Sequence, residues 1–231
     1  MMRSTISHPS PIFSTPQTLV ASPTAEFKTL QEFVAAARAK PGQINFASLG
    51  SGSTNHLSME MFRSAARIQL NHVPFKTSAD MYIQLLGGQV AVMSDVLPAA
   101  LMHVKSGRLR GLGVAKLTRS PFLPELPTIA ELGYPGFEAV GWVGIVAPAR
   151  TPAAILDKLN AEMVSIISDP DIRERLNTLA FTRSAAAAQN SPLTSNRKSS
   201  SAVKRSGTLA QQPTEPPLHF RIVAEARHQQ Y

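Results

Sequence analysis

The distribution of hydrophobic and polar positions divides the chain into three segments. Residues 1–26 are rich in Ser, Thr and Pro and predict poor order, apart from a short strand at 17–21. From Phe27 to Ala180, apolar residues recur at helical or strand spacing between clear stops, which is typical of a packed α/β unit. Beyond this segment the amphipathic pattern fails except for a weak window at 220–226, so residues 182–231 are predicted to be disordered.

Within the middle segment, strands and helices are expected to alternate. Thr29 and Glu32 form a capping box for a helix that buries Leu30, Phe33, Val34 and Ala37. Strands are predicted at 44–48, 69–73, 89–94, 109–115 and 137–147. This order predicts a largely parallel sheet with right-handed crossovers.

The remaining helices follow from their stop signals and apolar faces. One helix should bury Leu57, Met61, Phe62 and Ala65; others are expected after Ser78, at 98–105, briefly at 128–132, and from Asp169 to Ala180. Thr151 and Pro152 open a further helix whose predicted buried face holds Ile155, Leu156, Leu159, Met163, Ile166 and Ile167.

Composition excludes several classes of protein. The chain has 231 residues, a net charge of +8 and no cysteine, which removes disulfides and thiolate chemistry. Seven Lys/Arg and two Asp/Glu fall in residues 182–231, so the other 181 residues hold sixteen against thirteen. The basic tail has almost no aromatics for base stacking, and nucleic-acid binding is not expected. The six histidines show no metal-ligand spacing, and no metal or cofactor is predicted.

The sharpest local feature is a Gly/Ser turn between a predicted strand and a predicted helix. It contains Ser48, Gly50, Ser51, Gly52, Ser53, Thr54 and His56. Backbone N–H groups freed by glycine, hydroxyl donors and a helix N-terminus together favour a small carboxylate. An ordinary strand-to-helix turn capped by Ser53 or Thr54 is an equally weighted interpretation.

Two further segments should emerge at the same edge of a parallel sheet. They are Pro74, Phe75, Lys76, Thr77 and Ser78 after one strand, and Asp95 after another. Lys76 is either a countercharge or a solvated side chain, and an isolated Asp95 more often caps a helix than acts as an acid or base.

A hydrolase is the enzymatic alternative, with Ser51, Ser53 and His56 as its cluster. The turn lacks the G-x-S-x-G arrangement, no lysine follows its second glycine, and no acidic partner for His56 is evident. The chain is therefore not expected to be an enzyme.

These motifs appear in the order found in a known family. The runs 28–114 and 119–163, with "ASLGSGSTNH", "PFKTSA" and "SDVLPAAL", resemble the Bug/TctC receptors of tripartite tricarboxylate transporters. The resemblance implies a periplasmic-binding-protein-like α/β clamshell of type II. It also implies a monomer that binds small carboxylates and delivers them to membrane transporter subunits.

The resemblance transfers ligand-binding roles to the three edge segments named above. The family usually has Gly at the position of Thr77, so a Cβ there could narrow the pocket or change a backbone angle. It further implies a ligand-binding lobe at 27–118, a hinge and partial second lobe at 119–181, and a frame-shifted tail.

The resemblance also predicts that parts of the family pattern are missing. The first third and a strand crossing between lobes at 22–27 are expected to be absent, and residues 1–16 lack the apolar stretch of a signal peptide. The location implied by the family is the periplasm, but the chain as written would stay in the cytoplasm. Weak or no carboxylate binding is expected of such a damaged copy, and a non-functional remnant is the alternative.

Overall fold

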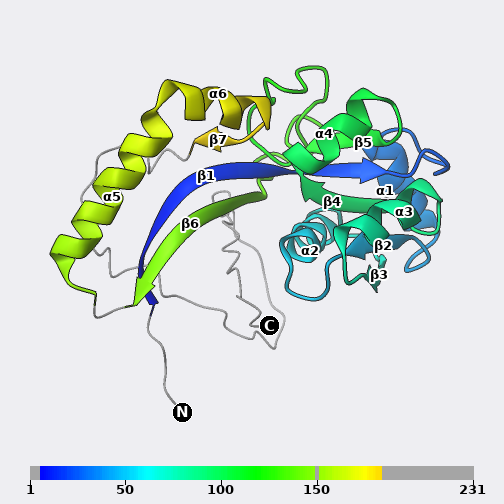
Figure 1. Ribbon diagram of the computed structural model, residues 1–231. Coiled ribbons are helices and arrows are strands. Elements are labelled where there is room, and N and C mark those ends of the chain that lie inside the picture. Colours follow the sequence, from blue (N-terminus) through cyan, green and yellow to red (C-terminus); the bar gives the residue numbers. More distant parts are fainter. Residues whose placement is uncertain (1–5, 149–150, 184–231) are drawn as a thin grey trace, which may run out of the picture.

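One strand links the two lobes of the molecule. The computed structural model describes residues 6–148 and 151–183, and in it β1 (Ile6–Ala21) arches across the whole structure (Figure 1). Its C-terminal part pairs with β4 and β5, and the part before Gln17 pairs with β6 and β7.

The prediction of poor order is therefore wrong for residues 6–16, whereas the strand predicted at 17–21 is present as the end of β1. A strand that crosses between the lobes is thus present. The sequence pattern did not predict this strand before Gln17 because it contains prolines, which are depleted in strands. Register shifts between Ser7 and Ser10 and between Pro11 and Phe13 accommodate the prolines opposite β6.

The larger lobe is built on the strand order β3-β2-β4-β1-β5. β2 (Asn45–Ser48) is parallel to β3 (Asn71–Pro74) and to β4 (Val92–Val96), whereas β1 runs antiparallel between β4 and β5 (Arg110–Val114). The predicted strands are all present, with ends displaced by a few residues. The predicted parallel pairing is found for β2 with β3 and with β4, whereas every pairing of β1 is antiparallel, so the sheet is not largely parallel. The larger lobe also includes residues 17–21, before the predicted boundary at Phe27.

Four helices cover this sheet (Figure 1): α1 (Leu30–Ala39), α2 (Thr54–Ala66), α3 (Ser78–Leu86) and α4 (Leu97–Lys105). The predicted face of α1 is buried. The predicted face of α2 is right at Phe62 but wrong at Ala65, which is exposed, and at Leu57, which is 37% exposed. The buried stripe also contains Asn55, Ser58, Met59 and Ala66. The polar residues at Asn55 and Ser58 bond to β4, which a hydrophobic pattern does not register.

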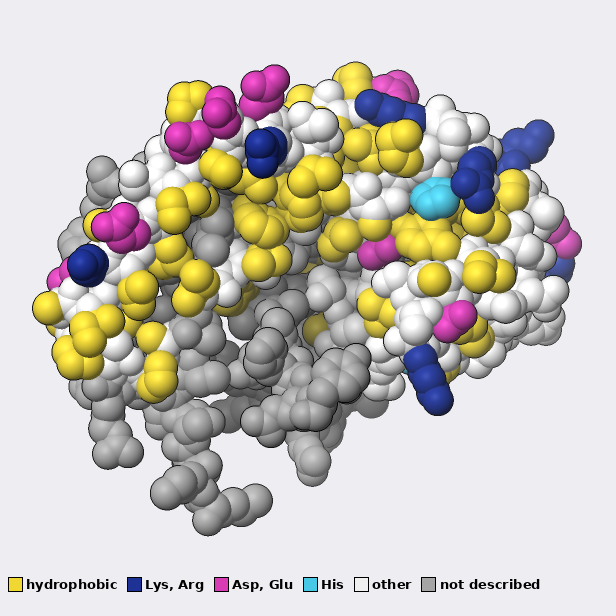
Figure 2. All heavy atoms as spheres, in the orientation of Figure 1, with side chains coloured by type: hydrophobic (Ala, Val, Ile, Leu, Met, Phe, Trp, Pro, Cys, Tyr) yellow, Lys and Arg dark blue, Asp and Glu magenta, His cyan; other side chains and the backbone are white. Residues whose placement is uncertain are grey.

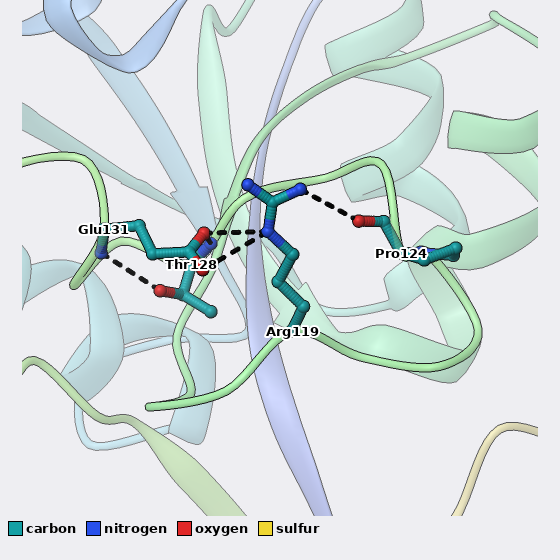
Figure 3. Close-up of polar contacts among 4 residues, drawn as sticks. All are labelled: Arg119, Pro124, Thr128 and Glu131. Carbon is teal, nitrogen blue, oxygen red and sulfur yellow. Dashed lines mark hydrogen bonds and ion pairs between the residues drawn. The ribbon is translucent and has the colours of Figure 1, made fainter.

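The segment between β5 and β6 is fastened by a polar network (Figure 3). The Nε of Arg119 donates to both carboxylate oxygens of Glu131, at 3.2 and 2.9 Å, and Nη1 donates to Pro124 O at 3.1 Å. Thr128 and Glu131 cap each other, and the Thr128 N–H, followed by Arg119, lowers the pKa of Glu131. The predicted helix at 128–132 is a turn, which ends at Gly133 with φ +105°.

The smaller lobe combines β1 with β6 (Val140–Pro148), β7 (Thr182–Arg183), α5 (Ala153–Ser168) and α6 (Pro170–Thr178). The predicted buried face of α5 is mostly wrong, since only Ile167 is buried, and Ile155, Leu159 and Ile166 are about half exposed. Figure 2 shows hydrophobic side chains on this face of the lobe. Among the described elements, α5 lies mainly against α6 and β1, which leaves this stripe uncovered.

Three further expectations concern the cap of α5, membrane-spanning helices and the C-terminal segment. Thr151 is not the cap of α5; Pro152 holds that position without a side-chain cap bond. None of the helices in the described part is long and apolar enough to cross a bilayer. The prediction of disorder at 182–231 lies outside the described residues except for Thr182 and Arg183, which form β7.

Candidate functional site

The Gly/Ser turn between β2 and α2 is held open by two left-handed glycines. Gly50 has φ +100° and Gly52 has φ +86°, conformations that side-chain-bearing residues rarely adopt. The turn wraps around the buried Ser48, whose Oγ accepts from Gly50 N at 3.0 Å and lies 2.6 Å from His72 Nε2. Ser48 therefore organises the turn from inside and does not present its hydroxyl to solvent.

Ser53 is the N-cap of α2 and closes the other side of the turn. Its Oγ accepts from His56 N at 3.3 Å and donates to Gly50 O at 2.7 Å. The first turn of the helix is tied to the sheet by Asn55, whose Nδ2 donates to Ser94 O and Asp95 Oδ1, both at 2.9 Å. The start of α2 is thus fixed both to the turn and to β4.

Several donors of this turn remain unused within the described residues. Neither the Ser51 backbone N–H nor the hydroxyls of Ser51 and Thr54 have a hydrogen-bond partner there. They stand at the N-terminus of a 13-residue helix, where the macrodipole places about half a positive charge. The arrangement can hold an anion with no Lys or Arg.

Two histidine rings pack against each other beside the turn, tilted by 53°. The rings of His56 and His72 are 4.4 Å apart, and Phe46 stacks on His72 at 4.9 Å. Burial, and then the neighbouring His56, lowers the pKa of His72. A neutral His72 can keep its bond to Ser48, so the pair supports the turn. Sequence analysis missed His72, because it lies 24 residues from Ser48.

The second predicted segment lies beside the first. Ser48 and Pro74 are register partners in β2 and β3, and Phe75 N donates to Ser48 O at 2.8 Å. Thr77, and not Ser78, caps α3: its Oγ1 accepts from Asp80 N at 3.1 Å. Thr77 has φ −130°, so its Cβ causes no backbone strain. Lys76 is exposed and has no ion pair among the described residues.

The third predicted residue, Asp95, is buried and points into the protein. Its carboxylate accepts from Tyr82 Oη and Asn55 Nδ2, both at 2.9 Å, and from Val96 N at 2.8 Å. Burial raises the pKa of Asp95 against the opposing effect of these three bonds. The structure thus brings Asp95 to the predicted edge, where its hydrogen bonds join α2, α3 and β4.

The predicted enzymatic cluster does not form a catalytic arrangement in the described residues. The Ser53 hydroxyl donates to a carbonyl, and His56 Nδ1 accepts from Gly52 N at 3.4 Å. No carboxylate bonds to His56, and no group of three potential metal ligands occurs in this part of the chain.

The chain matches a known protein family over most of its length. Residues 3–213 match the family described as "Tripartite tricarboxylate transporter family receptor". The chain belongs to this family, TctC. The TctC match continues past Phe181, and the predicted change of reading frame there stays a prediction.

Individual relatives agree with the TctC assignment. The chain is 38% identical over 167 residues to a UPF0065 protein of Pseudomonas sp. strain P51, covering 72% of this chain and 50% of that one. It is similar to periplasmic binding protein BugD, with TM-score 0.71 and 29% identity over 81% of this chain and 62% of that one. The adipate-bound Rpa4515 of R. palustris gives TM-score 0.70 and 29% identity, over 79% and 62%. The chain spans about half the length of three curated relatives that it matches.

These likenesses confirm the predicted Bug/TctC resemblance and the type II clamshell class of fold.

One residue at the same edge was not predicted as part of the site. Gln17 of β1 is the register partner of Val96 and is completely buried. A signal was available, since Gln17 and Thr18 are the only polar residues between Pro16 and the apolar run Leu19–Ala21.

Proposed function

We propose that this chain binds a small dicarboxylate and acts as part of a receptor that delivers it to a tripartite tricarboxylate transporter. The observation that carries the proposal is the turn of Gly50 to Thr54. It leaves donors free at the start of α2 and lies beside the Pro74–Ser78 turn. Membership of the TctC family and the likeness to an adipate-bound protein support the same ligand class.

A dicarboxylate can place one carboxylate at the Gly/Ser turn and the other at the neighbouring Pro74–Ser78 turn. One carboxylate would accept from the Ser51 N–H and the hydroxyls at the start of α2. The second would reach the Pro74–Ser78 turn, where Lys76 is the exposed cation. Hydrogen bonds to a charged group contribute about 1.5 to 3 kcal/mol each, so two or three of them contribute about 3 to 9 kcal/mol. Without any cost of association this corresponds to a roughly millimolar to micromolar complex, and the cost of association weakens it further.

The proposed role is binding without chemical conversion. Ser53 and His56 are engaged in holding the turn, so neither is poised as nucleophile or base. The periplasm is the location that fits the family, and transporter subunits are the partners.

Ligand-observed NMR tests this function because saturation transfer detects weak complexes. Adipate should show saturation transfer from the chain, hexanoate with one carboxylate should show less, and dimethyl adipate should show none. Lys76→Met tests the second contact and should weaken adipate more than hexanoate. Equal signals for adipate and its uncharged ester would contradict recognition of carboxylates.

A further inference from the structure

A buried amide on β1, the strand that links the lobes, has an unpaired nitrogen. Gln17 is 0% exposed, and its Oε1 lies 3.3 Å from Ser94 Oγ. Ser94 Oγ also donates to Ser58 Oγ, at 2.9 Å. Gln17 Nε2, which carries two donors, has no partner among the described residues. Buried polar groups are almost always paired, so this one requires an explanation.

The space beside this amide is kept open by a glycine. A Cβ added to Gly141 of β6 would lie 3.8 Å from Gln17 Nε2, 3.6 Å from Thr54 Cγ2 and 3.8 Å from Thr15 O. These are ordinary contact distances, so a methyl-sized space exists there. Gly141 does not have a positive φ, so the backbone does not require glycine. The missing side chain leaves room for one small atom between Gln17 and Thr54.

The position of this space connects it to the proposed site. Thr54 is the first residue of α2, and its hydroxyl is among the free donors of the Gly/Ser turn. Gln17 lies on β1, the strand that links the lobes, and Gly141 lies on the neighbouring β6 of the smaller lobe. The space beside the buried amide is therefore bordered by the first residue of α2, where the Gly/Ser turn ends.

We propose that Gln17 is a specificity-determining residue whose Nε2 donates to a carboxylate oxygen of the ligand, seated in the space beside Gly141. This inference rests on the proposed function. It explains why an unpaired amide is retained in a buried position: the ligand supplies the missing acceptor. It also makes β1, which links the lobes, and the neighbouring β6 part of the site, so that binding engages both lobes.

The test uses the full chain and three variants. Gln17→Met keeps a similar shape but removes the donors, and Gly141→Ala fills the space without a steric clash. Thr18→Val is the matched control, because Thr18 Oγ1 is also buried and unpaired but lies on the opposite face of the same strand. Adipate affinity is measured by NMR titration, and folding by the urea midpoint without ligand.

We expect Gln17→Met and Gly141→Ala each to weaken adipate by about tenfold or more, because that is the worth of a hydrogen bond to a charged group. Thr18→Val should bind as the unmodified chain does. If the unmodified chain binds no dicarboxylate, the proposed function is wrong and this inference falls with it. If it binds but Gln17→Met keeps full affinity, the inference alone is overturned. A change in the urea midpoint of Gly141→Ala with unchanged affinity would assign the space to a structural water and would also overturn it.

Discussion

Removal of the Ser53 hydroxyl should damage the ligand site more than it damages the fold. Ser53→Ala deletes the N-cap of α2 and the 2.7 Å bond that closes the turn on Gly50 O. Loss of a cap costs about 0.5 to 2 kcal/mol of stability. Release of the turn adds the entropy of about one backbone residue to the cost of binding, at about 1 to 2 kcal/mol, so affinity for adipate should fall by roughly tenfold.

A matched cap elsewhere separates these two effects. Thr29 caps α1 in the same way, since its Oγ1 accepts from Glu32 N at 3.2 Å, and it takes no part in the Gly/Ser turn. Urea denaturation should show a similar loss for Thr29→Ala and Ser53→Ala, whereas NMR titration with adipate should show weaker binding only for Ser53→Ala. Full affinity in Ser53→Ala, or an equal loss in Thr29→Ala, would refute this reasoning.

Three further predictions concern stability and titration. Because burial raises the pKa of Asp95 in the folded protein, its ionisation opposes folding, and the urea midpoint should fall as pH rises above 3.8. Asp95→Asn should remove this pH dependence, and an unchanged dependence in the variant would contradict the prediction. His72 has a lowered pKa, so stability should fall as pH drops below 6.5, and NMR titration of its ring should give a pKa below 6.5 that the Gly50 amide follows; a pKa of 6.5 or higher would count against the account. Phe62→Ala should cost about 3 to 5 kcal/mol in urea denaturation, because Phe62 packs against Phe33, Tyr134 and Phe137; a loss under about 1 kcal/mol would disagree.

The sequence predicted those elements whose local signals agree with their packing. In α1 the capping box of Thr29 and Glu32 and the buried face of Leu30 and Phe33 are both present. The Gly/Ser turn was also located correctly, because left-handed glycines between a strand and a helix leave a clear pattern. Local chemistry was sufficient in both places.

Elements that depend on distant partners were mispredicted. β1 contains three prolines and several serines, and only its pairing with β4, β5 and β6 makes it a strand. The face of α2 was misassigned because Asn55 is buried through bonds to Ser94 and Asp95, about 40 residues away. The exposed stripe of α5 shows the converse: its apolar period is real, but no described element covers it.

The sequence predicted where the candidate site lies better than it predicted what each side chain does there. Ser48, Ser53 and Asp95 lie at the expected edge, yet each uses its side chain to hold the site together. Hydrogen bonds between segments decide whether a donor is free, and one sequence does not contain that information. For the same reason Gln17 and His72 were absent from the prediction.

Amide-resolved NMR of the ¹⁵N-labelled chain during titration with adipate tests the central claim most directly. The account predicts that the amides of Gly50, Ser51, Gly52 and Thr54 shift together and saturably, while amides of α1 stay in place. Shifts spread evenly over the molecule, or confined to segments away from the Gly/Ser turn, would contradict it.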